Sequence, residues 1–337
     1  MAKRVTIKEV ANEAGVSVTT VSFVLNGKAE SVPDATKERI RRVVERLRYT
    51  PNRAARSLVM GRTNMIGIIV PSVTNFFFAE LVRLLQKKFA EQGYDIILSN
   101  NEESADNDLK YVDLLSGRNI DGLIFTPGAE SLLPDKANVL KERLDRITVP
   151  FLFLDRYIKG YPHIAIDNRA GGYRLAEYLL GRGHTKIGVV TGPMVLNSSY
   201  NRLKGFREKL NEAGVALSSE YIYEGQYDIE TGERATERFL QTNATAIFAF
   251  SDMQAYGIYK KLKQLGKRVP EDISVVGFDD NVYSSLLDKP LTTMRQPLEA
   301  LASDTVKAML DMIDGKEFEM TCKLPAKLIE RESVAQL

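Results

Sequence analysis

Short apolar runs alternate with amphipathic segments from residue 65 onward, and this alternation restricts the fold more than any other feature of the chain. It predicts parallel strands whose two faces are covered by helices. We expect strands at residues 65–70, 94–98, 122–125, 151–154, 186–190, 246–250 and 274–278. We expect helices to begin near Phe76, Asp106, Asn168, Tyr200, Ile229 and Asp252. The two similar series of elements predict an α/β fold with two similar lobes of parallel sheet.

The first 49 residues carry a different pattern, which predicts a helix-turn-helix. Thr6 is followed three residues later by Glu9, the spacing of a capping box that satisfies free N–H groups at a helix start. Gly15 can end this first helix in a left-handed conformation, and Ser17 can cap a second helix. Two short helices joined by a Gly-containing turn are the arrangement that places the second helix in the major groove of DNA.

Helical spacing assigns the faces of the second helix, which we expect at residues 18–25. The inward positions are Val21, Val24 and Leu25, and the outward positions are Val18, Thr19, Ser22 and Phe23. A third helix is expected after Pro33, with an apolar stripe at Ile40, Val43, Val44 and Leu47. Together these three helices predict a small headpiece that closes near Tyr49.

The charge of the chain is divided unequally along its length. Residues 1–62 hold 13 Lys and Arg against 6 Asp and Glu, a net charge of +7, whereas the rest of the chain holds 33 against 38, a net charge of −5. A basic first unit is typical of a protein that binds a polyanion, although a solvated charged face gives the same balance. Charge alone leaves these two interpretations open.

Residues 50–62 are predicted to form a hinge helix and linker between the headpiece and the lobes. Pro51 favours an extended Thr50, and Asn52 can cap a short helix that Gly61 interrupts. Such a helix is shorter than the ~12–15 residues that an isolated helix needs in water. We therefore expect it to order only against DNA and a second copy of the chain.

Polar residues follow the apolar runs, at the positions where open parallel sheets bind their ligands. These residues are Ser72, Asn75, Asn100, Asn101, Thr126, Asp155, Arg156, Asn197, Arg202, Ser251, Asp252, Asp279 and Asp280. Amide and carboxylate acceptors with planar Arg donors suit the hydroxyl groups of a sugar, and Arg also suits a carboxylate or a phosphate. Phe76, Phe77 and Tyr227 could supply an apolar wall. The pattern predicts a small hydroxyl-rich effector, most simply a carbohydrate. Any one of these residues, taken alone, could instead be an ordinary polar group at a strand end or helix cap.

The segments TIKEVANEAGVSVTTVSFVLNG and YTPNRAARSL resemble the headpiece of the lactose-repressor (LacI/GalR) family, and the resemblance extends over the whole chain. It implies that Val18, Thr19 and Phe23 read bases. It also implies contacts to phosphates, or a role in positioning the helix, for Ser17, Thr20, Ser22 and Asn26. Many members carry Arg at the position of Phe23, which cannot make a bidentate contact to guanine but could touch a thymine methyl group.

The same resemblance implies further DNA contacts at Thr6, Tyr49, Asn52, Ala55 and Arg56. Leu58 matches the family's hinge leucine, which inserts into the central base step of the operator from the minor groove. Two recognition helices must meet two half-sites, so the resemblance implies a homodimer on a palindromic operator in double-stranded DNA.

For the core, the resemblance implies two lobes like those of periplasmic sugar-binding proteins. The N-terminal lobe would comprise residues 63–165 and 294–323, and the C-terminal lobe residues 166–293 and 324–337. The resemblance assigns effector contacts to Asp155, Arg202 and Asp279, and an aromatic wall to Tyr227. The expected function is a repressor whose effector shifts the headpiece between states that do and do not fit the operator; the sign of that shift stays open.

Two other functions are alternatives. An enzyme fused to a helix-turn-helix is disfavoured, because no nucleophile with a base, metal-ligand cluster or phosphate-binding Gly-rich loop stands out, and Asp155 with Asp279 is the only candidate carboxylate pair. A regulator of the catabolite-control type, which uses a phosphorylated protein corepressor, fits the segments PSVTNFFFAEL and YDIILSN.

Several partners and locations are not expected. The single cysteine, Cys322, cannot form an intrachain disulfide, and no Cys and His cluster predicts a metal or another cofactor. No apolar run approaches the ~18–20 residues of a membrane span, and the polar N-terminus lacks the apolar region of a signal peptide. We expect a cytoplasmic protein.

Overall fold

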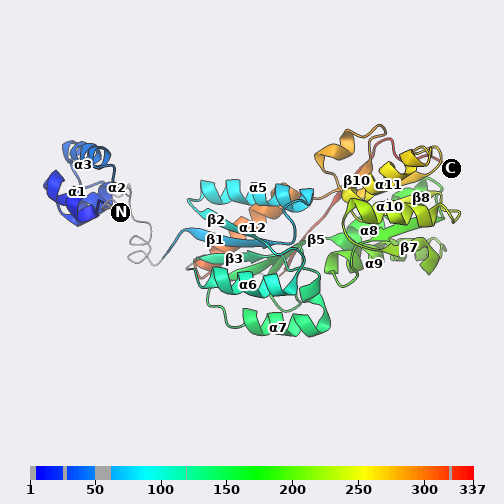
Figure 1. Cartoon of the computed structure of the whole chain (residues 1–337), viewed down its shortest axis with the longest axis horizontal. Coiled ribbons are helices and arrows are strands. Elements are labelled where there is room, and N and C mark those ends of the chain that lie inside the picture. The colour runs from blue at the N-terminus through cyan, green and yellow to red at the C-terminus, as the bar shows by residue number, and fades with distance from the viewer. Residues whose placement is uncertain (1–4, 26–28, 50–61, 119, 319–320) are drawn as a thin grey trace. The chain divides into compact units, whose positions relative to one another are not determined.

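The computed structural model describes residues 5–25, 29–49, 62–118, 120–318 and 321–337 (Figure 1). It divides the chain into two compact units, Met1–Thr63 and Asn64–Leu337. The first contains the three-helix headpiece, and the second, called the core below, contains both lobes. Each unit is described by itself.

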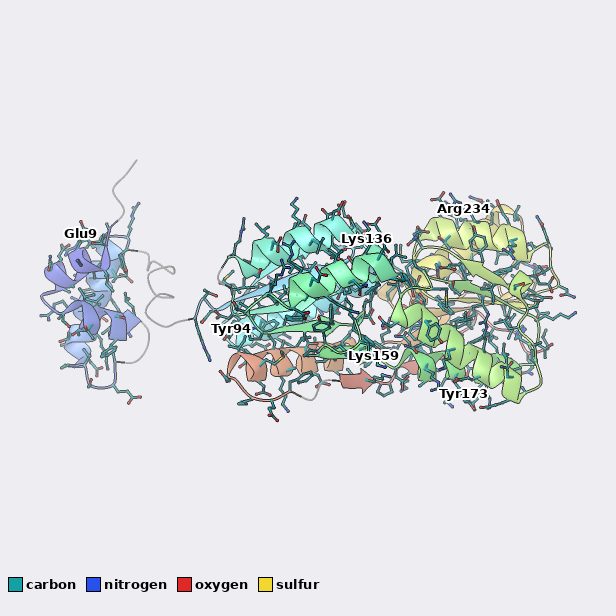
Figure 2. The ribbon with its side chains drawn as sticks, turned by 90° about the horizontal axis from the view of Figure 1, so that it is seen from below. Glu9, Tyr94, Lys136, Lys159, Tyr173 and Arg234 are labelled. Carbon is teal, nitrogen blue, oxygen red and sulfur yellow. The ribbon has the colours of Figure 1, made fainter. Side chains whose placement is uncertain are left out.

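The headpiece contains helices α1 (Ile7–Ala14), α2 (Val18–Leu25) and α3 (Asp34–Arg46). Thr6 and Glu9 form the predicted capping box, and Glu9 is labelled in Figure 2. Gly15 ends α1 with a φ of 62°, which is a left-handed conformation that glycine adopts without strain. The buried apolar residues of the three helices form one small core: Val10, Ala11, Ala14, Val21, Val24, Ala29, Ile40 and Val43.

The first lobe of the core has a six-stranded sheet in the order β11-β5-β4-β3-β1-β2. All its neighbouring strands are parallel: β1 (Met65–Val70), β2 (Asp95–Asn100), β3 (Gly122–Phe125), β4 (Phe151–Leu154), β5 (His163–Ile166) and β11 (Thr321–Leu324). Helices α5 (Phe76–Glu91) and α12 (Leu298–Ile313) cover one face, and α6 (Ala105–Ser116) and α7 (Pro134–Leu144) cover the other (Figure 1). A short 3-10 helix, η1 (Glu130–Leu132), precedes α7.

The second lobe repeats this plan with a sheet in the order β12-β10-β9-β8-β6-β7. Its strands are β6 (Ile187–Thr191), β7 (Ile222–Glu224), β8 (Ala246–Ala249), β9 (Ser274–Asp279), β10 (Thr292–Arg295) and the antiparallel β12 (Lys327–Ile329). One face carries α8 (Asn168–Gly181) and α9 (Asn197–Glu212), and the other carries α10 (Ile229–Phe239) and α11 (Asp252–Gln264). The 3-10 helices η2 (Ser219–Tyr221) and η3 (Val282–Ser285) lie in its loops.

The predicted fold class is confirmed, and the chain crosses between the lobes three times, after β5, β10 and β11. Two of the expected lobe boundaries were slightly misplaced. Met294 and Arg295 pair with β9 in the second lobe, so the chain returns to the first lobe after residue 295 rather than at 294. Leu324 pairs with Ile166 in the first lobe rather than belonging to the second.

Close helix crossings in the second lobe depend on glycine. A Cβ atom on Gly172 of α8 would lie 2.0 Å from the Arg202 carbonyl oxygen, and one on Gly205 of α9 would lie 1.9 Å from the Arg169 carbonyl oxygen. The backbones of α8 and α9 therefore touch at this crossing, which fixes where the buried face of α9 meets the sheet.

None of the helices formed by the described residues is both long and apolar enough to cross a membrane.

Candidate effector cleft and DNA-binding helix

A cavity of about 30 Å³ lies between the two lobes, beyond the carboxyl ends of their strands. Its lining comes from both lobes: Asn75, Phe77, Phe78, Asp155, Arg156, Ser198, Arg202, Tyr227, Phe250, Ser251, Asp279 and Gln296. Its volume is about the share that one water molecule takes in the liquid. Figure 2 labels Tyr94 on the first lobe and Tyr173 on the second, which helps to locate the cleft between them.

Asp155 and Arg156 follow β4 and place a carboxyl group and a guanidinium group at the cavity. Asp155 has a φ of 64°, a left-handed conformation that a non-glycine residue adopts only when its surroundings hold it there. Burial raises the pKa of Asp155, while the guanidinium groups of Arg156 and Arg202 act in the opposite direction. Arg156 donates from Nη1 to Glu103 Oε2 at 2.6 Å and lies over the ring of Phe78. Nη1 also donates to the Pro127 carbonyl oxygen at 3.4 Å. For Nε and Nη2, no hydrogen bond is found among the described residues, which leaves these groups available to a ligand.

Arg202 projects from the buried face of α9 and is held on several sides. Its Nε donates to Asn168 Oδ1 at 3.1 Å, and its Nη1 donates to the carbonyl oxygen of Phe250. Its guanidinium carbon lies 3.4 Å from the centre of the Phe278 ring, in a cation–π contact. These contacts fix the planar group at the wall of the cavity although the side chain is buried.

Asp279 ends β9 and faces the cavity from the second lobe. Its φ of 143° is unusual for a residue with a side chain. Gln296 donates from Nε2 to Asp279 Oδ1 at 2.6 Å, and the backbone N–H of Asp252 lies 3.3 Å from Oδ2. Burial and the nearby carboxylate of Asp252 raise the pKa of Asp279 well above its ordinary range. Because this carboxyl is easily protonated, it can serve as an acceptor or, when neutral, as a donor to a ligand.

The other predicted residues at the cavity have supporting bonds of their own. Asn75 caps α5 by accepting from the Phe77 N–H at 3.0 Å, and Ser251 caps α11 by accepting from the Gln254 N–H at 3.2 Å. The Tyr227 hydroxyl lies 2.7 Å from Ser199 Oγ. These bonds position the side chains before any ligand arrives.

Five residues predicted to contact the effector do not line this cavity: Ser72, Phe76, Asn100, Thr126 and Asp252. Asp252 is fully buried and accepts from Ser284 Oγ, Thr293 Oγ1 and the Asn281 N–H, so it holds a loop of the second lobe together. Thr126 donates to the Leu154 carbonyl oxygen at 2.8 Å inside the first lobe.

The other three are Ser72, Asn100 and Phe76. Ser72 contacts Thr74 within its own loop. The Oδ1 atom of Asn100 is buried without a hydrogen-bond partner among the described residues, yet it lies away from the cavity lining. Phe76 lies outside the cavity too, in an adjoining groove of about 890 Å³ to which Phe77, Asp279 and Gln296 also belong.

Sequence reasoning missed four residues of the lining: Phe78, Ser198, Phe250 and Gln296. Phe250 is the last residue of the strand expected at residues 246–250, whereas β8 ends at Ala249 and Phe250 follows it. Ser198 lies in the first turn of α9, which begins at Asn197 rather than near Tyr200. Gln296 lies in the returning segment between β10 and α12, where no apolar run indicates a strand end.

Helix α2 presents the predicted recognition face. Val18 and Phe23 are 40% and 44% exposed, whereas Val21 and Val24 are buried in the headpiece core. Ser17 Oγ accepts from the Thr20 N–H at 3.1 Å, which caps the helix. The faces of α2 are therefore those that the spacing predicts. Of the predicted DNA contacts, Thr6, Ser17, Val18, Thr19, Thr20, Ser22, Phe23 and Tyr49 are described, and Asn26, Asn52, Ala55, Arg56 and Leu58 lie outside the described residues.

Among the described residues, no group of three or more His, Cys, Asp or Glu side chains is arranged to hold a metal ion.

Comparison with known proteins identifies both parts of the chain. The model for bacterial regulatory proteins of the lacI family matches residues 6–52, and the model for a periplasmic binding protein-like domain matches residues 176–334. The chain is 32% identical over 337 residues to the HTH-type transcriptional regulator DegA of Bacillus subtilis (strain 168), covering 99% of both chains. It is 34% identical over 338 residues to the HTH-type transcriptional repressor PurR of Vibrio vulnificus (strain CMCP6), covering 98% of this chain and 99% of the relative.

Solved structures with the same fold include a Lac repressor dimer bound to operator and the anti-inducer ONPF, with a TM-score of 0.88 and 28% identity. That match covers 99% of this chain and all of the other. A complex of the transcriptional regulator CelR with cellobiose matches with a TM-score of 0.73 and 29% identity, covering 98% of this chain and all of the other. The chain therefore belongs to the lacI family of bacterial regulatory proteins, with a DNA-binding domain followed by an effector-binding domain.

Proposed function

We propose that this protein is a transcriptional repressor that binds a palindromic operator as a homodimer. Its operator affinity changes when a small molecule occupies the cleft between its lobes. The observation that carries the proposal is the lining of the cavity, where Asp155 and Arg156 from one lobe face Arg202 and Asp279 from the other. Acids and bases contributed by both lobes can form hydrogen bonds to one ligand only when the lobes are correctly placed. A ligand bound there favours one lobe arrangement over another.

The small size of the cavity supports a change in lobe arrangement on binding. At about 30 Å³ it is small for a sugar ring, which favours a lobe arrangement that opens to admit an effector. The arrangement described above is then one of at least two, and a ligand with different affinities for them shifts their populations.

The chemistry of the lining favours a hydroxyl-rich effector of the sugar class. Carboxylates accept from hydroxyl groups, Arg156 can donate to ring or hydroxyl oxygens, and Phe77, Tyr227 and Phe250 supply flat apolar surfaces. The structure of CelR contains the sugar cellobiose, which supports a sugar effector. The name of the PurR relatives points to purines, so a purine is the alternative effector. Flat aromatic walls and paired polar groups would also suit a purine base.

On the DNA side, we propose that Val18, Thr19 and Phe23 contact base edges and that Leu58 enters the minor groove. The exposure of Val18 and Phe23 in α2 supports the first part. For Leu58, replacement by Ala should weaken specific operator binding and leave effector affinity unchanged. A protein that acts on chromosomal DNA works in the cytoplasm of a bacterium.

The experiment is a thermal-shift screen of sugars, nucleosides and purine bases, followed by operator titration with each stabilising compound. Asp279→Asn should abolish the effector's influence on operator binding while operator affinity without effector persists. Asp288→Asn is the matched control, because Asp288 lies in the same lobe with its side chain 89% exposed. If Asp279→Asn responds to the effector as the parent protein does, the effector does not act through this cleft.

A further inference from the structure

The cavity continues into a second compartment of about 210 Å³ on the other side of Asp155. Asp155 and Ser198 line both spaces, so they are adjoining parts of one cleft. The walls of the compartment include Arg169 at the start of α8, Asn201 and Lys204 on α9, and Lys323 on β11. Tyr173, labelled in Figure 2, marks α8. At about 30 Å³ for each water in the liquid, the compartment has the volume of roughly seven waters, room for a substituent but not for a second large ligand.

Two lysines line the compartment without an acidic partner. Lys204 and Lys323 form no ion pair with the described residues, and both are exposed to solvent. Arg169 is neutralised by Glu208, with Nε and Oε2 2.7 Å apart. Two acids line the compartment as well. Asp167 caps α8 by accepting from the Ala170 N–H at 3.0 Å, and the charge of Asp155 is opposed by the adjacent guanidinium groups of Arg156 and Arg202. The two unpaired lysines supply the positive charge that favours an anion.

Uncommitted hydrogen-bond donors are aimed at the same space. Ser198 is 5% exposed, lines both compartments and makes no side-chain hydrogen bond to the described residues. The amide of Asn201 is likewise without a partner in the described part of the chain. Helix α9 starts here with no side-chain cap at Leu196, so its first N–H groups and its positive dipole end are available.

A two-point contact holds the start of α9 against the first lobe. Asn197 Oδ1 accepts from the Tyr157 N–H at 3.1 Å, and Asn197 Nδ2 donates to the Tyr157 carbonyl oxygen at 3.0 Å. This contact keeps Ser198 beside Asp155 and brings Lys204, one to two turns further along α9, to the same wall as Lys323. In this lobe arrangement the donors are held together at one wall, as in anion sites at helix starts.

We propose that this compartment binds the phosphate group of a phosphorylated small molecule whose uncharged part occupies the adjoining cavity. The inference rests on the proposed function, because it adds a second contact to the effector of the same cleft. Lys204 and Lys323 provide the charge, and Ser198, Asn201 and the start of α9 provide the hydrogen bonds to the phosphate oxygens. A free sugar or a purine base lacks the group that this compartment fits.

The test uses inorganic phosphate as the probe, titrated calorimetrically into the full-length protein at constant ionic strength. Saturable binding is expected in the parent protein. The double variant Lys204→Gln, Lys323→Gln should weaken it roughly tenfold or more, because both charged donors to the phosphate oxygens are lost. The matched control is Lys267→Gln, Lys307→Gln, which removes two exposed lysines that line no part of the cleft and should bind phosphate as the parent does.

Absence of saturable phosphate binding in the parent, or equal binding in the Lys204 and Lys323 variant, would overturn the inference. Circular dichroism and thermal unfolding of both variants should match the parent, because all four lysines are exposed. The proposed function is tested separately, by operator titrations with compounds that bind the cleft. It is contradicted if none of these compounds changes operator affinity. An unphosphorylated sugar that binds and shifts operator affinity while phosphate does not bind would leave the proposed function standing and remove this inference.

Discussion

Arg202 balances the charges of the effector cleft, since it is buried near both Asp155 and Asp279. Its planar group reaches Asn168 and the Phe250 carbonyl oxygen at once and stacks on Phe278. Lysine keeps the charge but lacks the fork and the flat face. Arg202→Lys should therefore lower effector affinity and reduce the free energy of unfolding by about 1–3 kcal/mol, measured by calorimetry and urea denaturation. Arg207→Lys, at an exposed position of the same helix, is the control and should change neither. Equal behaviour of the two variants would contradict this role for Arg202.

Asp108 is another buried acid, in the first lobe and outside the cleft lining. It accepts from Asn101 Nδ2, the Gly128 N–H at 2.8 Å and Ser131 Oγ at 2.6 Å. Burial raises its pKa from 3.8 to about 6, even though these three donors favour the ionised form. The folded protein thus holds this proton more tightly than the unfolded chain. The resulting stabilisation is full below the unfolded pKa and is lost as the pH rises through the folded pKa.

The pH dependence can be isolated with Asp108→Asn, which cannot ionise. The variant should be less stable overall because its NH₂ group replaces an acceptor. The stability advantage of the parent over the variant should shrink by about 2 kcal/mol between about pH 4.5 and pH 7. Urea denaturation of both proteins across that range measures the difference. An advantage that stays constant or grows with pH would show that the pKa of Asp108 is not raised in the folded state.

In the proposed DNA complex, Phe23 limits which base contact α2 makes at one position. It is 44% exposed and has no polar group, so a thymine methyl is the base feature that it can recognise. Phe23→Ala should weaken binding to an operator selected from random duplexes by about 1 kcal/mol, the lower end for a base contact. The stability of the headpiece should change by no more than about 0.5 kcal/mol, because the side chain is a surface group.

Single replacements of thymine by uracil in that operator provide the decisive comparison. One replacement should weaken the parent and leave Phe23→Ala unaffected. If every replacement affects both proteins equally, Phe23 contacts no thymine methyl.

At the scale of elements, the crossing of α8 and α9 positions the cleft residues carried by α9. Because a Cβ on Gly205 would lie 1.9 Å from the Arg169 carbonyl oxygen, Gly205→Ala must push the helices apart. We expect a loss of about 1–3 kcal/mol of unfolding free energy and weaker effector binding. Gly181→Ala is the control, since its Cβ would meet nothing within 4 Å, and it should be neutral or up to about 1 kcal/mol more stable. Similar losses in both variants would argue against a close crossing.

The elements that the sequence predicted are those with long apolar runs. Strands β1, β3 and β4 have the predicted bounds, and α5, α8, α10 and α11 begin at the predicted residues. The strands that escaped prediction have three or four residues of mixed polarity: β5, β7, β10, β11 and β12. The equally short β3 and β4 were predictable because their residues form apolar runs. A short segment of mixed polarity cannot be distinguished from a loop by its pattern, and pairing with neighbours distant in sequence makes it a strand.

Whether a cleft residue could be predicted from the sequence also depends on its place relative to an apolar run. Residues placed directly after long runs, such as Asp155 and Asp279, were predictable because parallel strands end at one edge of a sheet. Gln296 was not predictable, because it reaches the cavity through a chain crossing that depends on the whole topology. Asp252 has the right position and chemistry, but its carboxylate is occupied by bonds within its own lobe. Which polar groups remain available depends on partners that sequence order does not reveal.

At the scale of the whole molecule, the proposed function links the two units of the chain through one equilibrium. The headpiece exposes Val18 and Phe23 on α2, and the core has a small cavity between its lobes. If each ligand prefers one state of the protein, binding of either must change the affinity for the other by the same factor. This reciprocity follows from thermodynamics and does not depend on the route between the sites.

The most direct test measures four dissociation constants with one effector found by the screen: operator with and without saturating effector, and effector with and without saturating operator. The account predicts that operator affinity changes roughly 5- to 150-fold and that effector affinity changes by the same factor. An operator affinity that is unchanged when the cleft is saturated would contradict the central claim that cleft and headpiece are linked.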